Sequence, residues 1–520
     1  MLFFFVAVAS TCQYQADTDY DCTAGSSVHA TSQEACCQAC HTEVDCIAGV
    51  YQPSTAKCYL KGGVVVAKAK SGVMGCVARQ PQPAPPFDCS APDADCAGRL
   101  GATHWNPCYF VNSSVPSLID GALAVSGMGS RVIKVALFSP KGNYPFNSPK
   151  WPDDAGFPTL LSMAQHQYYQ QLWELPDIET YVLIAYSTVG GAAGGDISYW
   201  VQGISAAQRA EEEAQLHSCA TWLLQRYAHL GKTFIFENWE GDWASRGGSY
   251  NPKVPATPLA LASMRDWLEA RQAGVSRARS EHEASSEDSI KPGIKPGTKL
   301  GIKPGTVWFS AEVNLIKDSR TEGLPNMVNR VLPFVATDLV SYSSYDTQAD
   351  RSEFEAALHY LAAQQNRTAA SPPGLRSVFV AEYGLPQNHV GTATLQALVK
   401  NVVNVALSLG VRHVLFWETY DNECTASVPG CSGGGDRGTP FFASHAFMAS
   451  ALNGPADTMS PTAWSPARRL GTGRCHDATH PVTDPSDLNG FWLVRPDGSK
   501  AWPYIFLAGL IANRSQALGA

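Results

Sequence analysis

The most constraining feature of this chain is an alternation of strand-like and helix-like segments that repeats eight times after residue 99. The strand-like runs are short, apolar and rich in β-branched and aromatic residues, which is typical of buried strands in a parallel sheet. Strands are expected at residues 105–111, 131–138, 181–186, 232–239, 307–314, 338–346, 377–382 and 411–417. Helices are expected at residues 114–127, 159–175, 206–230, 353–365, 392–409 and 502–513. Since eight such units close naturally into a cylinder, the sequence predicts an α/β fold, a (β/α)8 TIM barrel.

A doubly wound open sheet is the rival architecture, because βα alternation alone does not settle closure. Such a sheet normally carries a Gly-rich phosphate-binding turn after its first strand. Gly127, Gly129 and the glycines of 190–195 do not follow that pattern, and no Gly-Lys-Ser/Thr phosphate loop occurs. A nucleotide cofactor is therefore not expected.

Two glutamates, Glu240 and Glu382, stand where apolar runs stop, in the fourth and the seventh of the eight expected units. The carboxyl ends of all barrel strands meet at one face, so residues far apart in sequence can converge there. A pair of carboxylates suits hydrolysis of a glycosidic bond, in which one protonates the leaving oxygen and the other attacks the anomeric carbon. A single glutamate at a strand end is more often a salt-bridge partner, and it is the pairing that favours catalysis.

Net charge and length limit the classes of molecule that this chain is expected to bind. The chain has 520 residues and a net charge of −8, with no basic run long enough to follow a phosphate backbone, so nucleic acid is not an expected partner. His104, His166, His413 and His445 lack metal-ligand spacing, so neither a metal nor another cofactor is expected. A Ser-His-Asp hydrolase is not supported either, since no Gly-x-Ser-x-Gly elbow follows a strand. The chain is expected to act as a monomer on carbohydrate.

The first residues and the cysteines predict export. Residues 1–10 form an apolar run that is too short to span a bilayer and ends in small residues, so they are interpreted as a signal peptide remnant. Eight of the 15 cysteines lie within the first eighty residues, as in a small disulfide-stapled module from an oxidising compartment. Sequons at Asn112, Asn366 and Asn513 are compatible with a glycoprotein. A secreted, extracellular protein is expected.

The N-terminal module has its own pattern, in which Cys36, Cys37 and Cys40 lie on one predicted helix. The spacing of Cys36 and Cys40 places two thiols on one helix face, where they can tie the helix to neighbouring strands. With the later Cys58-Tyr-Leu-Lys61 strand, this resembles the PAN/Apple domain, which by that resemblance binds protein or carbohydrate. Zinc is the competing interpretation, for which only Cys37 and Cys40 have the Cys-x-x-Cys spacing.

The expected domain layout follows from these patterns. Residues 12–78 form the PAN/Apple-like module, residues 79–98 a Pro-rich linker, and residues 99–520 the barrel. Two insertions are expected in the barrel, a Lys-Pro-Gly-rich one at 285–306 and a long excursion after the eighth strand at 424–489. The second should lie on the active face, since it follows a strand's carboxyl end.

Several motifs resemble those of the clan A glycoside hydrolases, the retaining barrels that include cellulases and mannanases. Val380-Ala-Glu382-Tyr-Gly384 is similar to the strand-seven nucleophile motif of that clan, and Trp417 to the tryptophan that floors the subsite at the scissile bond. Tyr342 and Tyr345 occupy the place of a tyrosine that hydrogen-bonds the nucleophile. The resemblance implies a retaining glycosidase with Glu382 as the nucleophile and Glu240 as the acid/base.

One departure concerns the acid/base. The clan usually has Asn immediately before this glutamate, whereas this chain has Glu237-Asn238-Trp239-Glu240. Either Glu240 is the acid, or Glu237 takes that role and Glu240 lines the cleft. Glu240 is favoured because it lies further beyond the apolar run. The expected sugar-binding residues are Glu237, Asn238, Trp239, Asn314, Tyr342, Tyr345 and Trp417.

The missing Asn-Glu pair also supports a second function class. The chain could be a secreted, non-catalytic carbohydrate-binding or adhesion protein on a degenerate glycosidase barrel. The joint presence of Glu240, Glu382 and Trp417 favours the enzyme.

Overall fold

A computed structural model describes residues 13–42, 46–77, 87–91, 94–246, 254–288, 305–425, 431–432, 472–475 and 481–512. The chain divides into two units, Met1–Pro86 and Phe87–Ala520, and this division falls inside the predicted linker at 79–98. The predicted signal remnant at 1–10 and most of the two insertions, at 285–306 and 424–489, lie outside the described residues. Among the described helices, none is both long enough and apolar enough to span a bilayer.

The N-terminal unit is a small antiparallel sheet with one helix. Its strands β1 (Gln13–His29), β3 (Lys57–Val77) and β2 (Cys46–Gln52) lie in that order, and α1 is Gln33–Thr42. A disulfide joins Cys36 of α1 to Cys58 of β3, so the predicted tie between this helix and a strand is confirmed. Cys37 and Cys40 are also disulfide-bonded, so the zinc interpretation of these cysteines is wrong.

The second unit is built on a closed barrel of parallel strands, in the order β10-β12-β13-β4-β5-β6-β7-β8. The strands are β4 (Leu100–His104), β5 (Val132–Leu137), β6 (Thr180–Ala185), β7 (Thr233–Glu237), β8 (Val307–Val313), β10 (Leu339–Ser343), β12 (Val378–Tyr383) and β13 (Val414–Phe416). The predicted (β/α)8 fold is confirmed, and closure excludes the open sheet. Almost every strand residue is buried.

The first barrel strand is not where the sequence placed it. We expected 105–111, whereas β4 covers Leu100–His104. Residues 105–111 cannot continue the strand, because Asn106 has φ of 53° and Pro107 has no N–H to donate to a ladder. The true strand contains Gly101, at which a Cβ would meet the Val132 carbonyl oxygen at 2.3 Å. A glycine needed for close packing made the strand look weak.

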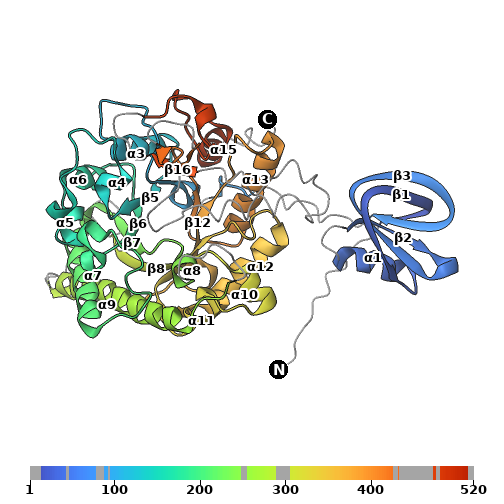
Figure 1. The fold of residues 1–520 in the computed structure, drawn as a ribbon, viewed down its shortest axis with the longest axis horizontal. Coiled ribbons are helices and arrows are strands. Elements are labelled where there is room, and N and C mark those ends of the chain that lie inside the picture. The colour runs from blue at the N-terminus through green and yellow to red at the C-terminus, as the bar shows by residue number, and fades with distance from the viewer. Residues whose placement is uncertain are drawn as a thin grey trace. The chain divides into compact units, whose positions relative to one another are not determined.

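Helices surround the strands (Figure 1). They are α3 (Ser117–Gly127), α4 (Pro140–Asn143), α5 (Leu160–Ala164), α6 (Gln167–Trp173), α7 (Ala206–Tyr227), α8 (Gly241–Ser245), α9 (Pro258–Asp288), α10 (Lys317–Glu322), α11 (Met327–Arg330), α12 (Arg351–Gln364), α13 (Thr392–Ser408) and α15 (Trp502–Ile511). The single helix expected at 159–175 is two helices, because His166 has an extended ψ of 143° and caps α6 with its ring nitrogen. The predicted helices at 114–127, 206–230, 353–365, 392–409 and 502–513 are present with small shifts of their ends.

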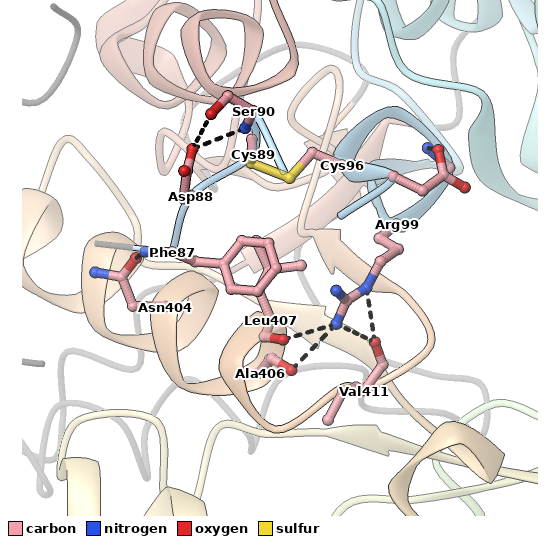
Figure 2. The surroundings of a disulfide bond; sticks show 12 residues. Phe87, Asp88, Cys89, Ser90, Cys96, Arg99, Asn404, Ala406, Leu407 and Val411 are labelled. Atoms are coloured by element: carbon pink, nitrogen blue, oxygen red, sulfur yellow. Dashed lines mark hydrogen bonds between the residues drawn. A yellow bond between two sulfur atoms is a disulfide. The ribbon is translucent and has the colours of Figure 1, made fainter. Parts of the chain in front are cut away.

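A short segment before β4 secures the end of the barrel opposite the strands' carboxyl ends. A disulfide joins Cys89 to Cys96, the first residue of α2 (Cys96–Arg99). The Arg99 guanidinium donates to the carbonyl oxygens of Leu407 at 3.0 Å and Val411 at 2.7 Å (Figure 2). These bonds tie the segment to the last turn of α13 and to the loop that follows it. The segment thereby holds the start of β4 against the strand that closes the barrel.

Candidate active site

The two predicted catalytic glutamates lie on different structural elements, one on a strand and the other on a turn. Glu382 is part of β12 itself, near its carboxyl end. Glu237 is the last residue of β7, and Glu240 lies three residues further on, immediately before α8. Glu240 is therefore on a turn beyond the strand, and Glu237 is the residue at the strand end proper.

A buried lysine connects three carboxylates across the barrel interior. Lys134 of β5 places Nζ 3.0 Å from Glu237 Oε1, 2.9 Å from Glu312 Oε2 and 3.0 Å from Glu382 Oε1. The side chains of Lys134, Glu237 and Glu312 are fully buried, and that of Glu382 is 3% exposed. Because a buried charge without a partner is strongly unfavourable, each group in this cluster depends on the others.

Burial and charge together set the acidities of the cluster. Burial lowers the pKa of Lys134, but the three carboxylates outweigh it and raise that pKa well above its usual value. Burial raises the pKa of Glu382 to about 7, although Lys134 pulls it down. Burial likewise raises the pKa of Glu237 to about 8, against the same pull. The cluster therefore keeps its lysine charged and places the pKa values of Glu237 and Glu382 near neutral pH.

The second oxygen of Glu382 is held by a tyrosine. Tyr345, in the loop after β10, donates its hydroxyl to Glu382 Oε2 at 3.2 Å. The hydroxyl of Tyr342, the other tyrosine considered for this place, instead contacts Asp346 and Thr347. Glu382 thus accepts from Lys134 on one oxygen and from Tyr345 on the other, and both bonds favour its ionised form.

Glu240 has a different environment. Its φ of 28° and ψ of 61° are strained for a residue with a side chain. Oε2 accepts the indole N–H of Trp243 at 2.7 Å, whereas no described residue hydrogen-bonds Oε1. Burial, and then the charges of Glu382 and Glu312, raise the pKa of Glu240 well above its usual value. The surroundings of Glu240 therefore favour its protonated form.

The strained turn is held by a set of backbone contacts. Asp242 accepts the N–H groups of Asn314 at 3.0 Å, Leu315 at 3.3 Å and Met327 at 2.8 Å. A Cβ at Gly241 would lie 2.7 Å from Met327 Sδ, so the residue after Glu240 must be small. These contacts fasten the turn to the loop after β8 and to α11.

A buried arginine supports the same turn from the outer side. Arg271 of α9 donates to the carbonyl oxygens of Ala185 at 2.7 Å and Glu237 at 3.3 Å, which are the carboxyl ends of β6 and β7. Glu212 of α7 neutralises it in an ion pair of 2.7 Å. The positions of α7 and α9 are therefore coupled to that of the strand leading to Glu240.

Three tryptophans meet edge to face near the glutamates. The Trp105 ring centroid is 5.8 Å from that of Trp239 and 5.9 Å from that of Trp417. Trp239, at 6% exposure, is the most accessible of the three. Its backbone N–H donates to the Tyr186 hydroxyl at 3.0 Å. Trp239 and Trp417, both predicted to bind sugar, are thus brought together by Trp105, which we had placed in a strand.

Other predicted sugar contacts turn toward protein partners. The Asn238 amide donates to the Glu312 carbonyl at 3.0 Å and accepts the Glu312 N–H at 3.2 Å, which ties β7 to β8. With its amide oriented to satisfy both neighbours, Asn314 donates to Asp242 Oδ2 at 3.2 Å and accepts from Trp243 Nε1 at 2.8 Å. Glu237 binds Lys134 and the Ser341 hydroxyl. These residues therefore bind neighbouring protein groups and hold the strands and loops of the site in place.

Further acidic residues border the site. Glu418, next to Trp417, has its pKa raised well above the usual value by burial and by the charges of Asp421, Glu423 and Glu382. Asp346 accepts the N–H groups of Ile316 and Lys317, so it organises a loop. In the described part of the chain, no group of three or more His, Cys, Asp or Glu side chains has a metal-binding arrangement.

Sequence reasoning missed Lys134, Trp105 and Trp243. Lys134 had a usable signal, since it interrupts the apolar run Arg131-Val-Ile-Lys-Val-Ala-Leu-Phe138 and a lysine inside a buried strand requires a partner. Trp243 stands three residues after Glu240, the spacing that brings side chains together on one helical turn. Trp105 carried no comparable signal.

No protein-family model and no curated protein matches this chain. Among solved structures, it is similar to a GH5_18 from Bifidobacterium longum subsp. infantis, with a TM-score of 0.40 and 12% identity over 81% of this chain and 79% of that chain. It is also similar to a GH5 xyloglucanase from Bacteroides ovatus, with a TM-score of 0.33 and 10% identity over 85% and 96%. A family 5 xyloglucanase from Paenibacillus pabuli gives a TM-score of 0.35 and 11% identity over 69% and 99%. With scores this low, the likenesses carry no argument about activity, which must come from the site itself.

Proposed function

We propose that this chain is a retaining glycoside hydrolase with Glu382 as the nucleophile and Glu240 as the acid/base. The observation that carries the proposal concerns two buried carboxyls that interact electrostatically. They differ in the hydrogen-bond donors that surround them. Glu382 accepts from Lys134 and Tyr345, whereas Glu240 has one donor, Trp243, among the described residues. Two carboxyls whose surroundings separate their pKa values are what acid and nucleophile roles require.

The chemistry follows in two steps. In the first, a Glu382 oxygen bonds to the anomeric carbon, the glycosidic C–O bond breaks, and the Glu240 proton moves to the leaving oxygen. In the second, ionised Glu240 takes a proton from water while the water oxygen bonds to the anomeric carbon and the bond to Glu382 breaks. Glu382 and Glu240 then return to their starting charges.

Glu240 fits the acid role better than Glu237 does. Glu237 Oε1 forms an ion pair with Lys134 at 3.0 Å but no hydrogen bond of good geometry, and Oε2 accepts the Ser341 hydroxyl, so both of its oxygens face protein groups inside the barrel. Glu240 retains an oxygen without a hydrogen-bond partner among the described residues, and it lies close enough to Glu382 for their charges to interact. A catalytic acid needs such an oxygen to reach its substrate.

The substrate class and location are part of the proposal. The clustered tryptophans Trp105, Trp239 and Trp417 suit a polysaccharide or oligosaccharide, because sugar rings stack on aromatic faces. The disulfides Cys36–Cys58 and Cys89–Cys96 support export to an oxidising compartment. The N-terminal unit, as a PAN/Apple-like module, would add a binding site for protein or carbohydrate.

The experiment is a screen of the secreted protein against β-mannan, β-glucan, xylan and aryl glycosides, followed by the E382Q variant on every substrate that is cleaved. We expect hydrolysis of at least one substrate and a loss of roughly 10⁴-fold or more in E382Q, as for removal of a nucleophile. Undiminished turnover in a folded E382Q protein would refute the nucleophile. No turnover by the parent on any glycan, with retained binding, would favour the non-catalytic carbohydrate-binding protein.

A further inference from the structure

The indole of Trp243 gives the proposed acid a fixed direction. Trp243 and Glu240 lie at the start of α8, and both are almost fully buried. The indole Nε1 is 2.7 Å from Glu240 Oε2. At this distance the N–H makes a strong hydrogen bond to that oxygen.

An indole N–H can donate but not accept. The oxygen that it meets must present a lone pair, and the carbonyl oxygen of a neutral carboxyl is a better acceptor than its hydroxyl oxygen, so the indole favours the form of Glu240 that carries its proton on Oε1. The proton is then on Oε1, for which no described residue provides a hydrogen-bond partner. A buried polar atom left without a partner is unusual enough to require an explanation, and contact with a substrate supplies one.

We propose that Trp243 is a positioning residue that keeps the proton of Glu240 on Oε1, the oxygen that has no protein partner. This inference rests on the proposed role of Glu240 as the acid/base. Trp243 does not touch the reacting atoms and acts through the carboxyl that it orients. It also stabilises the ionised Glu240 that forms once the proton has left.

A second acceptor competes for the same hydrogen. Asn314 accepts from Trp243 Nε1 at 2.8 Å while its amide nitrogen binds Asp242 Oδ2. Asp242 in turn holds the backbone of the Asn314 loop. The Trp243 N–H therefore has two acceptors, a carboxyl whose charge changes during the proposed reaction and an amide whose charge does not.

The charged groups around Glu240 come from several elements. They are Glu382 of β12, Glu312 of β8 and Lys134 of β5, with the Tyr345 hydroxyl from the loop after β10. Burial and the negative groups raise the pKa of Glu240, and the Trp243 N–H opposes them by lowering it. Removing that N–H removes a bond to the charged form, so the pKa of Glu240 rises further. Glu382 accepts its hydrogen bonds from Lys134 and Tyr345, which W243F leaves in place, so it should titrate as before.

The first test is the pH profile of W243F, in which a ring remains but the N–H is lost. We expect the basic limb of kcat/KM, which reports protonated Glu240, to move up by about one pH unit, as for loss of a hydrogen bond to a charged group. The acidic limb should stay in place. The matched control is W222F, since Trp222 is a half-buried residue of α7 that packs edge-on against Tyr227. An unmoved basic limb in folded W243F overturns the proposal.

The second test needs no turnover. In protein labelled with ¹⁵N-tryptophan, the Trp243 indole signal is the one that W243F lacks. We expect that N–H signal to lie downfield in the parent and in E240Q, which keeps an acceptor, and to move upfield in E240L, which has none. An unmoved signal in folded E240L would show that Asn314 is the acceptor and would overturn the proposal. Absence of turnover in the parent counts against the hydrolase alone, because the spectra report the Trp243–Glu240 bond directly.

Discussion

The two sides of the active site differ in how they hold the same functional group. On the β12 side, Glu382 is part of a barrel strand and accepts from Lys134 and Tyr345. On the β7 side, Glu240 is on a strained turn and accepts from Trp243 alone among the described residues. The comparison teaches that two glutamates of the same residue type differ in the hydrogen-bond donors around them, which is the difference that the proposed nucleophile and acid roles require.

The two sides also differ in the contacts that hold each glutamate in place. Glu382 is fixed by strand pairing to β10 and β13, which is part of the barrel itself. The Glu240 turn depends on a few specific contacts, namely those of Asp242, Gly241 and Arg271. Substitutions beside Glu382 should therefore act through charge, and substitutions beside Glu240 through geometry.

The largest expected effect comes from replacing the acid. E240Q should lower kcat/KM for a substrate with a poor leaving group by about 10²- to 10⁴-fold, because the leaving oxygen loses its proton donor. E237Q is the matched control, since it replaces the neighbouring carboxyl, leaves the proposed acid in place and should cost less. Steady-state kinetics on an alkyl and a nitrophenyl glycoside check this. A larger loss in E237Q than in E240Q would transfer the acid role to Glu237.

The next effect concerns the buried lysine. K134M leaves Glu237, Glu312 and Glu382 without their cation, which should lower the free energy of unfolding at pH 7 by about 3 to 5 kcal/mol. The loss should be smaller at lower pH, because carboxyls with raised pKa values become protonated there and no longer repel one another. K141M is the control, since Lys141 pairs with exposed Asp153 and should change stability far less than K134M does. Denaturant titration at two pH values measures both, and equal losses would argue against the cluster.

A smaller effect is expected in the pH profile of the parent. Glu382 must be ionised to attack, and burial raises its pKa to about 7. The rate should therefore fall about tenfold for each pH unit below that value. The profile of kcat/KM between pH 4 and 9 tests this, and full activity at pH 5 would show that Glu382 is more acidic than its surroundings imply.

The smallest effect tests the turn. G241A places a Cβ 2.7 Å from Met327 Sδ, 3.1 Å from Asn238 Nδ2 and 3.2 Å from Met264 Cε. We expect a loss of about 1 to 3 kcal/mol in unfolding free energy with a fall in kcat. G391A is the control, because a Cβ at Gly391 would meet nothing within 4 Å. If the two variants are equally stable and equally active, the turn is not constrained as described.

Much of the fold could be predicted, because buried parallel strands such as Val132–Leu137 and Val378–Tyr383 are apolar runs that only one charged residue each interrupts. The first strand was missed because its Gly101 serves packing rather than β propensity. The break between α5 and α6 was missed because it depends on the local conformation of His166.

The site was only partly predictable. Glu240, Glu382, Trp417 and Tyr345 could be proposed from their places at strand ends. Lys134 has partners on three other strands, and only barrel closure brings them within 3.0 Å. Asn238 looked like a sugar ligand, because the sequence does not show that its amide pairs with the Glu312 backbone.

The measurement that tests the central claim most directly is mass spectrometry of the enzyme after reaction with a 2-deoxy-2-fluoroglycosyl fluoride of the sugar that the glycan screen identifies. The fluorine slows the second step, so a covalent intermediate accumulates. We predict one glycosyl adduct, located on the peptide that contains Glu382 and absent from E382Q. An adduct on another residue, or hydrolysis with inversion and no adduct, would contradict the assignment of Glu382 as the nucleophile.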